Sequence, residues 1–466
     1  MTTRAYSYTH LTSQLPSMTD LPTSQMVRDA IIGCTDVTIV LDDDPTGTQT
    51  VRGVPVLTEW TQDVLTQEIL SGTPLFYILT NTRSLAKNEA EVLNLEVLSR
   101  ISQVTSMLNK RCTIISRSDS TLRGHYPMEA NVIIETLKPT KPVQFIIPAF
   151  FEGGRYTIDD VHYVREGEDM IPAHLTPFAK DKVFGFASSN LIEWVQEKHR
   201  GGALGNVHSL SIEQIRTETT EGIIHDIQSF DTGDICVVNA VNYDDLFKSI
   251  YCIMKSGVSP VFRTAASAIV AFTQDIPAVI DQIPRHGNSH GGVVVLGSYV
   301  PKSTDQLYHV LENTEIEHIE IDVSSLLSGT TASPQEIANQ VDELIDKGHD
   351  VIIYTSRKLI STEVKDNNLN IGAQVSSYLT GIVSSLSIEP SFIIGKGGIT
   401  SSDIATKSLR IQRALVLGQI IPGVPVWEQQ AESKFPGIPY IVFPGNVGSE
   451  ASLTEVIKKL SHENIN

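Results

Sequence analysis

Acidic and basic side chains gather where four short apolar runs end in the first half of the sequence. These runs are Val37–Leu41, Leu75–Leu79, Cys112–Ile115 and Val143–Ile147. The charged residues that follow them include Asp43, Asp44, Arg83, Arg117, Asp119, Arg123 and Arg155. Guanidinium forks match carboxylates in bidentate fashion, and carboxylates accept a hydroxyl hydrogen or its proton. The combination predicts a binding site for a small polyhydroxy acid. Asp43, Asp44 and Asp119 are alternative catalytic bases, and the sequence leaves their ranking open.

Different chemistry follows the apolar runs of the second half. These runs are Val293–Leu296, Val351–Tyr354, Phe392–Ile394 and Tyr440–Phe443. Small, mostly uncharged residues come after them, among them Gly397, Gly398, Thr400, Gly445, Asn446 and Gly448. Glycine lets backbone N–H groups approach phosphate oxygens, and a helix N-terminus adds a favourable dipole. We therefore expect a phosphate cradle at 397–401, opening a helix over Ser402–Arg413.

The order of the apolar runs indicates how these segments are positioned. A helical pattern from about Leu85 to Asn109 separates two strand-like runs, and Ser333 to Glu336 forms a capping box before another helix. Strand–helix alternation is typical of a parallel sheet, whose ligands bind beyond the carboxyl ends of its strands. We predict an α/β fold of two domains. Each is a largely parallel sheet flanked by helices, with a ligand cleft between the domains.

Length and charge limit the classes of protein that fit. A chain of 466 residues favours two domains. We expect a flexible leader over 1–35, an acid-binding domain over 36–285 and a nucleotide-binding domain over 286–466. A net charge of −19 argues against partners such as nucleic acid or anionic membranes, and no apolar run reaches the ~20 residues of a membrane helix. We expect a cytoplasmic protein and leave a homo-oligomer open.

Two common nucleotide-binding motifs are absent from the sequence. There is no GxxxxGK[ST] of P-loop enzymes and no GxGxxG after the first strand. The charged and glycine-rich segments favour a kinase. A dinucleotide-dependent oxidoreductase on a doubly wound fold and a non-catalytic sugar-acid sensor remain as alternatives.

The charged and glycine-rich segments together resemble the four-carbon acid sugar kinase family. The matching segments, in family order, are Asp43-Asp44-Pro45-Thr46-Gly47, Asp119-Ser120-Thr121-Leu122-Arg123-Gly124, Gly297-Ser298 with Ser303 and Gln306, Gly397-Gly398-Ile399-Thr400-Ser401, Gly418-Gln419 with Pro422-Gly423-Val424-Pro425, and Pro444-Gly445-Asn446-Val447-Gly448. Arg117 and Ile399 stand where that family usually has Lys and Glu.

The resemblance implies an N-terminal sugar-acid domain and a C-terminal ATP domain that uses Mg²⁺. Substrates of the family include threonate, erythronate and 3-oxo-tetronates. By this resemblance Asp43, Arg83, Arg117, Asp119, Ser120 and Arg123 would face the acid. Likewise Ser298, Gly397, Gly398, Ile399, Thr400, Gly445 and Gly448 would face ATP. The predicted activity is ATP-dependent phosphorylation of a hydroxyl on a small sugar acid, with metal ligands unassigned.

Overall fold

A computed structural model describes residues 6–200, 205–276, 278–280, 283, 289–298, 300–357 and 365–461, with 365–370 through their backbone only. The chain divides into two compact units. Unit 1 is Met1–Val51 with Glu59–Pro277, and unit 2 is Arg52–Thr58 with Ala278–Asn466. The domain boundary predicted at residue 286 lies outside the described residues.

Unit 1 is built on a parallel sheet with the order β10-β11-β6-β12-β5-β2-β4. Its strands are β2 (Val37–Asp42), β4 (Leu75–Leu79), β5 (Cys112–Arg117), β6 (Pro142–Ile147), β10 (Val207–Leu210), β11 (Ile235–Val238) and β12 (Ser259–Thr264). The interior strands are apolar almost throughout because helices cover both faces of such a sheet. The parallel sheet predicted for this half of the chain is confirmed.

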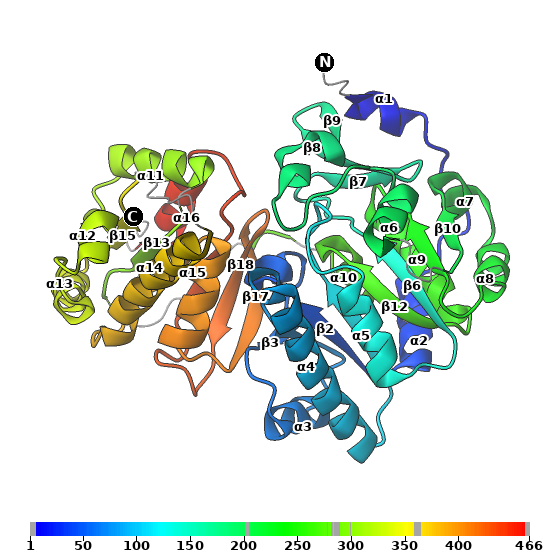
Figure 1. Ribbon diagram of the computed structural model, residues 1–466, viewed down its shortest axis with the longest axis horizontal. Helices are drawn as coiled ribbons and strands as arrows, with labels where there is room; N and C mark the ends of the chain where they lie inside the picture. Colours follow the sequence, from blue (N-terminus) through cyan, green and yellow to red (C-terminus); the bar gives the residue numbers. More distant parts are fainter. Residues whose placement is uncertain are drawn as a thin grey trace. The chain divides into compact units, whose positions relative to one another are not determined.

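The helices of unit 1 flank this sheet (Figure 1). They are α1 (Tyr8–Ser13), α2 (Ser24–Cys34), α3 (Gln62–Leu70), α4 (Lys87–Met107), α5 (Met128–Leu137), α6 (Leu191–His199), α7 (Ile212–Thr217), α8 (Thr220–Gln228), α9 (Tyr243–Lys255) and α10 (Ala266–Thr273). Helix α2 lies within the predicted flexible leader, and the structure differs there. Its Val27, Ala30 and Ile31 are buried, and the helix packs against α9. These apolar residues recur at helical spacing among polar residues, which predicts an amphipathic helix. The overall composition of residues 1–35 does not reveal this spacing.

A small antiparallel sheet completes unit 1. Its order is β1-β9-β8-β7, formed by β1 (Tyr6–Ser7), β7 (Arg155–Ile158), β8 (Val161–Glu166) and β9 (Asp169–Pro172). Strand β7 begins at Arg155, so this sheet carries one of the predicted site arginines.

Unit 2 has a mixed sheet with the order β3-β17-β18-β19-β16-β13-β15-β14. Its strands are β3 (Val54–Leu57), β13 (Val293–Leu296), β14 (Glu317–Ile321), β15 (Val351–Thr355), β16 (Ile393–Lys396), β17 (Arg413–Ile421), β18 (Val424–Gln429) and β19 (Pro439–Phe443). Strands β14, β15, β13, β16 and β19 are parallel, whereas β18, β17 and β3 continue the sheet in antiparallel fashion.

The helices of unit 2 are α11 (Pro301–Asn313), α12 (Val323–Ser328), α13 (Pro334–Asp346), α14 (Lys365–Ser385), α15 (Gly398–Asp403) and α16 (Ser452–Leu460). Helix α13 begins as predicted, with Ser333 and Glu336 forming its capping box. The helix predicted over Ser402–Arg413 is wrong. Helix α15 already begins at Gly398, gives way to a π-helical turn at Ile404–Ser408, and Arg413 opens β17.

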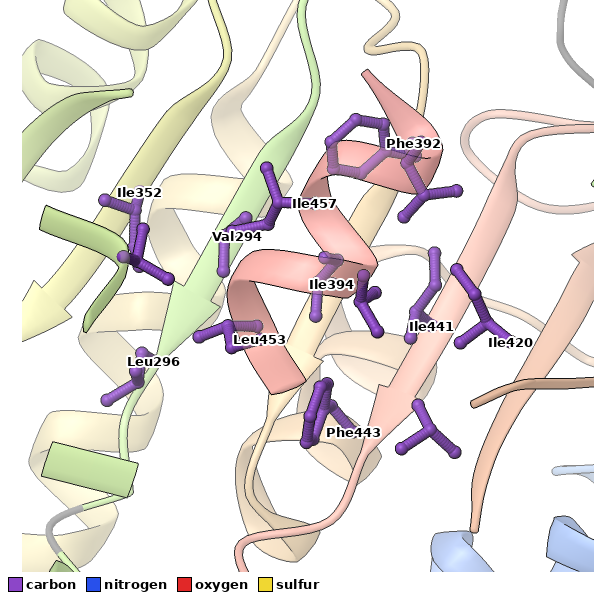
Figure 2. Close-up of a cluster of buried hydrophobic side chains, with 14 of the residues drawn as sticks. Val294, Leu296, Ile352, Phe392, Ile394, Ile420, Ile441, Phe443, Leu453 and Ile457 are labelled. Carbon is purple, nitrogen blue, oxygen red and sulfur yellow. The ribbon is translucent and has the colours of Figure 1, made fainter. Parts of the chain in front are cut away.

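A buried apolar cluster holds α16 on the unit 2 sheet (Figure 2). Leu453 and Ile457 of α16 lie over strand residues that include Val294, Ile394 and Ile441, all fully or almost fully buried. At roughly 25 cal/mol per Å² of buried apolar surface, each such side chain contributes about 1.5–3 kcal/mol. The cluster therefore fixes the ends of β13, β16 and β19, where the glycine-rich segments begin.

Candidate functional site

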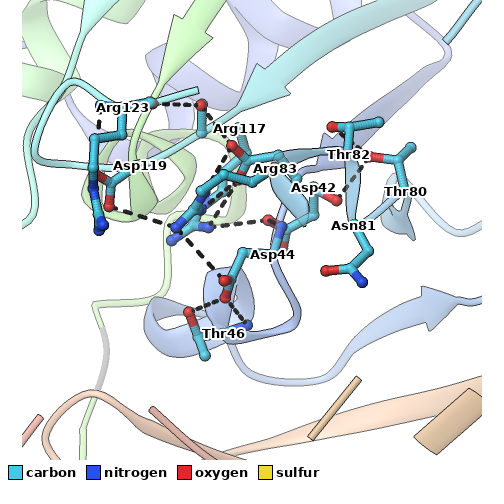
Figure 3. Close-up of polar contacts among 12 residues, drawn as sticks. Asp42, Asp44, Thr46, Thr80, Asn81, Thr82, Arg83, Arg117, Asp119 and Arg123 are labelled. Carbon is cyan, nitrogen blue, oxygen red and sulfur yellow. Dashed lines mark hydrogen bonds and ion pairs between the residues drawn. The ribbon is translucent and has the colours of Figure 1, made fainter. Parts of the chain in front are cut away.

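Arg83 lies at the centre of a carboxylate cluster at the ends of β2 and β4 (Figure 3). Its Nε donates to Asp43 Oδ2 at 3.1 Å, and Nη2 donates to Asp43 Oδ1 at 2.5 Å. Its Nη1 lies 3.5 Å from Asp44 Oδ2 and 3.6 Å from Asp119 Oδ1. One guanidinium therefore joins all three of the predicted catalytic aspartates.

A second ion pair lies directly behind this cluster. Asp42 and Arg117 are the last residues of β2 and β5 and are register partners in the sheet. Arg117 Nη1 donates to Asp42 Oδ1 at 3.0 Å and lies 3.8 Å from Asp43 Oδ1. Burial raises the pKa of Asp42 to about 7, against the opposing effect of the Arg117 charge.

Contacts within the segment from Ser118 to Gly124 account for the spacing of Asp119, Arg123 and Gly124 in the sequence. Asp119 Oδ2 accepts from Arg123 Nε at 2.8 Å and from the Thr121 hydroxyl. Gly124 has a φ of 118°, and a Cβ there would lie 2.3 Å from Ser118 Oγ, so only glycine fits. The Ser118 hydroxyl in turn donates to Asp43 Oδ2 at 2.7 Å. The loop is therefore folded around the Asp43 carboxylate.

The electrostatics of Asp119 follow from its two neighbouring arginines. Burial by itself would raise the pKa of Asp119, but Arg123 and Arg83 outweigh it and hold that pKa well below its usual range. Asp119 is therefore ionised at neutral pH. The neighbouring Ser120, also predicted to face the acid, is buried, and its carbonyl accepts from His162 Nε2 at 2.7 Å.

Arg155 stands apart from the carboxylate cluster. Its guanidinium carbon lies 5.8 Å from the ring centre of Phe178, and that of Arg123 lies 5.1 Å from the same ring. Arg155 Nη1 donates to the Gly153 carbonyl, and its buried Nε has no hydrogen-bond partner. Among the described residues, no carboxylate lies within ion-pair distance of Arg155. Arg155 therefore lacks the direct ion-pair partner that each of the other three predicted arginines has.

The three predicted bases differ in how fully their oxygens are occupied. Asp43 is 2% exposed, and both of its oxygens accept close hydrogen bonds. Asp44 and Asp119 side chains are 19% and 11% exposed. In each, one oxygen accepts the close hydrogen bonds and the other meets Arg83 only at 3.5 or 3.6 Å. Asp44 and Asp119 are thus better placed than Asp43 to accept an external hydroxyl.

In unit 2, the ends of β13, β16 and β19 bring Ser298, Gly397 and Gly445 together. A Cβ at Gly397, whose φ is 107°, would lie 2.9 Å from Ser298 Cβ. A Cβ at Gly445 would lie 3.5 Å from Ser298 Oγ. Ser303 donates to Ser298 Oγ at 3.1 Å and to the Gly445 carbonyl at 3.2 Å. The structure therefore gathers three segments that were predicted to bind nucleotide.

Hydrogen bonds and close packing fix the rest of this group. Gln306 Nε2 donates to the carbonyls of Val447 and Ser449, which hold the loop containing Gly448. Gly398 is the first residue of α15. Gly297 packs against Thr400, and a Cβ at Gly297 would lie 2.5 Å from Thr400 Oγ1. The glycines leave room for a phosphate chain to approach the backbone of these loops, because any larger side chain at their positions would occupy that room.

Two of the predicted nucleotide residues face outward. Ile399 is 62% exposed, and Asn446 is exposed as well. Neither supports the packing of its loop, so both side chains are accessible to a ligand.

Sequence reasoning missed several residues of these sites. Arg263, at the end of β12, donates to the carbonyls of Asp119 and Arg123 at 3.3 and 3.0 Å. Applying the strand-end rule to the unrecognised strand β12 would have found it. The same rule points to Lys396, two residues after the run Phe392–Ile394, whereas Phe178 gave no such signal, because a lone aromatic residue has a packing role far more often.

Metal ligands are not evident in the described part of the chain. Within it, no group of three or more His, Cys, Asp or Glu side chains is arranged to hold a metal ion. No described helix has the length and apolar character needed to cross a membrane. Mg²⁺ in proteins is usually bound through one or two carboxylates together with substrate phosphates, an arrangement that does not require such a group.

Comparison with protein families assigns a class to both units. Residues 38–272 match the sugar-binding N-terminal domain, and residues 293–453 match the nucleotide-binding C-terminal domain. The chain belongs to the family that these two domains define. This agrees, at the level of the domains, with the resemblance to four-carbon acid sugar kinases. Comparison with curated proteins gives no match.

Solved structures with TM-scores of 0.60 and 0.65 share the fold at low sequence identity. A Salmonella typhimurium LT2 protein, named for a proposed tRNA synthase activity, is 16% identical, with a TM-score of 0.65 over 91% of this chain and 99% of its own. A Haemophilus influenzae protein of the DUF1537 family is 17% identical, with a TM-score of 0.60 over 90% and 98%. A Bordetella bronchiseptica DUF1537 domain, solved with citrate as a domain-swapped dimer, is 14% identical, with a TM-score of 0.37 over 95% and 97%.

Proposed function

We propose that this protein is an ATP-dependent kinase that phosphorylates a hydroxyl of a small, four-carbon sugar acid. The domain matches supply the two ligand classes, a sugar and a nucleotide. The observation that carries the proposal is the Arg83-centred cluster, in which one cation holds three aspartates, together with Arg155, which shares the Phe178 ring with Arg123 and has no ion-pair partner among the described residues. A neutral sugar would need the aspartates but not that additional cation.

Arg155 is the side chain we assign to the substrate carboxylate. Arg83, Arg117 and Arg123 already have carboxylate partners within the protein. A carboxylate at Arg155 would gain a charge-assisted hydrogen bond, which is roughly twice as strong as a neutral one. Phe178 lies under the guanidiniums of both Arg155 and Arg123 and would keep the Arg155 fork flat and in place.

Asp44 and Asp119 are the two bases that we propose for the reacting hydroxyl. Each keeps one oxygen without a close hydrogen bond, and Arg83 lies within 3.6 Å of both. The base would accept the hydroxyl proton as the oxygen attacks the terminal phosphorus of ATP. That step forms the new O–P bond, breaks the bond to ADP and leaves the proton on the aspartate. Asp43 is then a positioning residue that fixes Arg83.

We assign the nucleotide to the cluster of Ser298, Gly397, Gly398, Thr400 and Gly445, with Ile399, Asn446 and Gly448 at its edge. Backbone N–H groups would bind the phosphates there, since side chains at the glycine positions would block them. ATP would enter as its Mg²⁺ complex, so the ion is part of the substrate.

The direct test is turnover of the purified full-length chain with Mg-ATP and a panel of four-carbon compounds. The panel contains threonate, erythronate, 3-oxo-tetronates and the uncharged polyol threitol, with ADP release as the readout. We expect turnover with at least one acid and none with threitol. A protein that reduces NAD with an acid, or one that binds an acid without any ATP turnover, would replace the proposal with the oxidoreductase or sensor alternative.

The Arg155 assignment has its own test with Arg155→Gln and Arg155→Lys. We expect Arg155→Gln to raise the KM for the acid about 10- to 100-fold, the size of one lost charge-assisted hydrogen bond. Arg155→Lys should recover part of that loss, because the charge remains without the fork. A matched change of the exposed Arg100→Gln should leave KM unaltered. An unchanged KM in Arg155→Gln would refute the assignment.

A further inference from the structure

Lys396 is a buried lysine that none of the nucleotide motifs includes. It ends β16 with an exposure of 0%, and its Nζ donates to the Pro444 carbonyl at 2.6 Å and lies 3.4 Å from that of Gly445. The ammonium also sits 4.2 Å from the ring centre of Phe443. No carboxylate in the described part of the chain lies within ion-pair distance of it. A buried ammonium whose partners are carbonyls and a ring face is costly unless an anion comes close.

The carbonyls that Lys396 binds determine where the neighbouring amides point. In a trans peptide the C=O of one residue and the N–H of the next point in opposite directions. With the Pro444 and Gly445 carbonyls turned toward Lys396, the N–H groups of Gly445 and Asn446 point away from it. Neither N–H donates to a protein group among the residues that the structure describes. Two successive free amides of this kind form an anion-binding concavity.

The neighbours of this turn link it to the nucleotide cluster. Ser303 reinforces the same Gly445 carbonyl, and Gly397, the residue after Lys396, packs on Ser298. Burial, with a smaller effect from Lys302, lowers the pKa of Lys396 to about 7. The ammonium is thus weakly stabilised in the free protein, and an added phosphate charge would stabilise it.

We propose that Lys396 is a positioning residue of the nucleotide site, which turns the Gly445 and Asn446 amides toward the phosphates and offsets part of their charge. This inference rests on the proposed function, because it assumes that the anion is the phosphate chain of ATP. Lys396 acts through the loop rather than by touching the reacting atoms. It should therefore set affinity for phosphates more than the rate of the chemical step.

The test compares Lys396→Met, Lys396→Arg and the matched control Lys407→Met in the full-length protein. Lys407 lies in the turn after α15, is exposed and pairs with Asp403. The probes are ATP, AMP and inorganic tripolyphosphate, measured by calorimetry. We expect Lys396→Met to weaken ATP and tripolyphosphate about 10- to 100-fold, with a smaller effect on AMP. Lys396→Arg should recover part of the loss and Lys407→Met should match the wild type.

Turnover measurements separate positioning from a general loss of structure. We expect the KM for ATP to rise in Lys396→Met while kcat and the KM for the acid change less than about threefold. Hydrogen exchange on the wild type gives a second measurement that needs no variant. Amides 445 and 446 should become protected when ATP binds.

The outcomes distinguish this inference from the proposed function. Wild-type affinity for ATP in Lys396→Met, or unprotected amides at 445 and 446 in ATP-bound wild type, would overturn the role of Lys396 alone. Absence of ATP and tripolyphosphate binding by the wild type would overturn the kinase proposal and this inference together. If Lys396→Met does not fold, the exchange measurement decides.

Discussion

Replacing Arg83 with methionine should destabilise unit 1 more than any surface change can. Methionine keeps the apolar length of the side chain but removes the charge shared by Asp43, Asp44 and Asp119. At an effective dielectric constant of 20, one charge pair at about 3.5 Å is worth roughly 4–5 kcal/mol before desolvation. Removing one partner of a buried pair costs about 3–5 kcal/mol. The three aspartates would also repel one another, so we expect a loss at the upper end of that range.

Urea unfolding followed by hydrogen exchange of peptides covering β2 and β4 would measure this loss. Exchange is needed because a chain of two units need not unfold in one step. Arg83→Lys keeps the charge without the fork and should lose about half as much. Arg100→Met is the surface control, since its pair with Glu96 is exposed and should contribute less than about 1 kcal/mol. If Arg83→Met lost less than about 1 kcal/mol, the description of Arg83 as the centre of the site would be wrong.

Three further predictions follow from the contacts. In turnover assays, Asp44→Asn or Asp119→Asn should lower the kcat of the folded protein at least 100-fold, whereas Asp43→Asn should lower stability without a comparable loss of kcat; equal kcat in all three would contradict the ranking. Gly397→Ala places a methyl 2.9 Å from Ser298 Cβ at a φ of 107°, so calorimetry should show ATP binding at least 10-fold weaker and acid binding unchanged. Its control is Gly372→Ala in α14, where a Cβ meets nothing within 4 Å. The pKa of Asp42 is about 7 in the folded protein and about 3.9 in the unfolded chain. The folded state therefore holds this proton more tightly, and the free energy of unfolding should fall by up to about 4 kcal/mol as pH rises from about 4 to 7. In urea titrations, Asp42→Asn should reduce the dependence of stability on pH between about 4 and 7. Part of that dependence should remain, because burial raises the pKa of Glu129 to about 7 as well. A pH dependence as steep as that of the wild type would refute this prediction.

The residues at strand ends were predictable because a buried parallel strand appears in the sequence as a short continuous apolar run, so its end can be located without knowing its partners. The runs at Leu75–Leu79 and Val293–Leu296 are strands with the predicted bounds. The parallel topology then placed Arg83 and Asp43 at neighbouring strand ends without any knowledge of tertiary contacts. The α/β class with mostly parallel sheets is confirmed for the same reason.

Pairing between distant segments was not predictable from local pattern. Strand β3 comes from residues 54–57 yet pairs with β17, more than 350 positions later in the chain. The stretch before Arg413 combines residues that suit a helix or a turn, and pairing with the antiparallel strands β3 and β18 makes the following residues a strand. Which arginine neutralises which aspartate depends on side-chain distances, so Arg155 could not be separated from Arg83 in advance.

The two units share one electrostatic feature that connects their proposed ligands. Unit 1 surrounds most of its site cations with carboxylates but leaves Arg155 without one, and unit 2 buries Lys396 against carbonyls and a ring. A buried cation without an ion-pair partner raises the free energy of the ligand-free protein relative to the anion-bound protein. Each unit is therefore poised for an anion of its own. A carboxylate suits the planar fork of Arg155, and a phosphate chain suits the amides that Lys396 orients. A kinase for a sugar acid is a reaction class that requires both anions at once, whereas a kinase for an uncharged sugar leaves Arg155 unexplained.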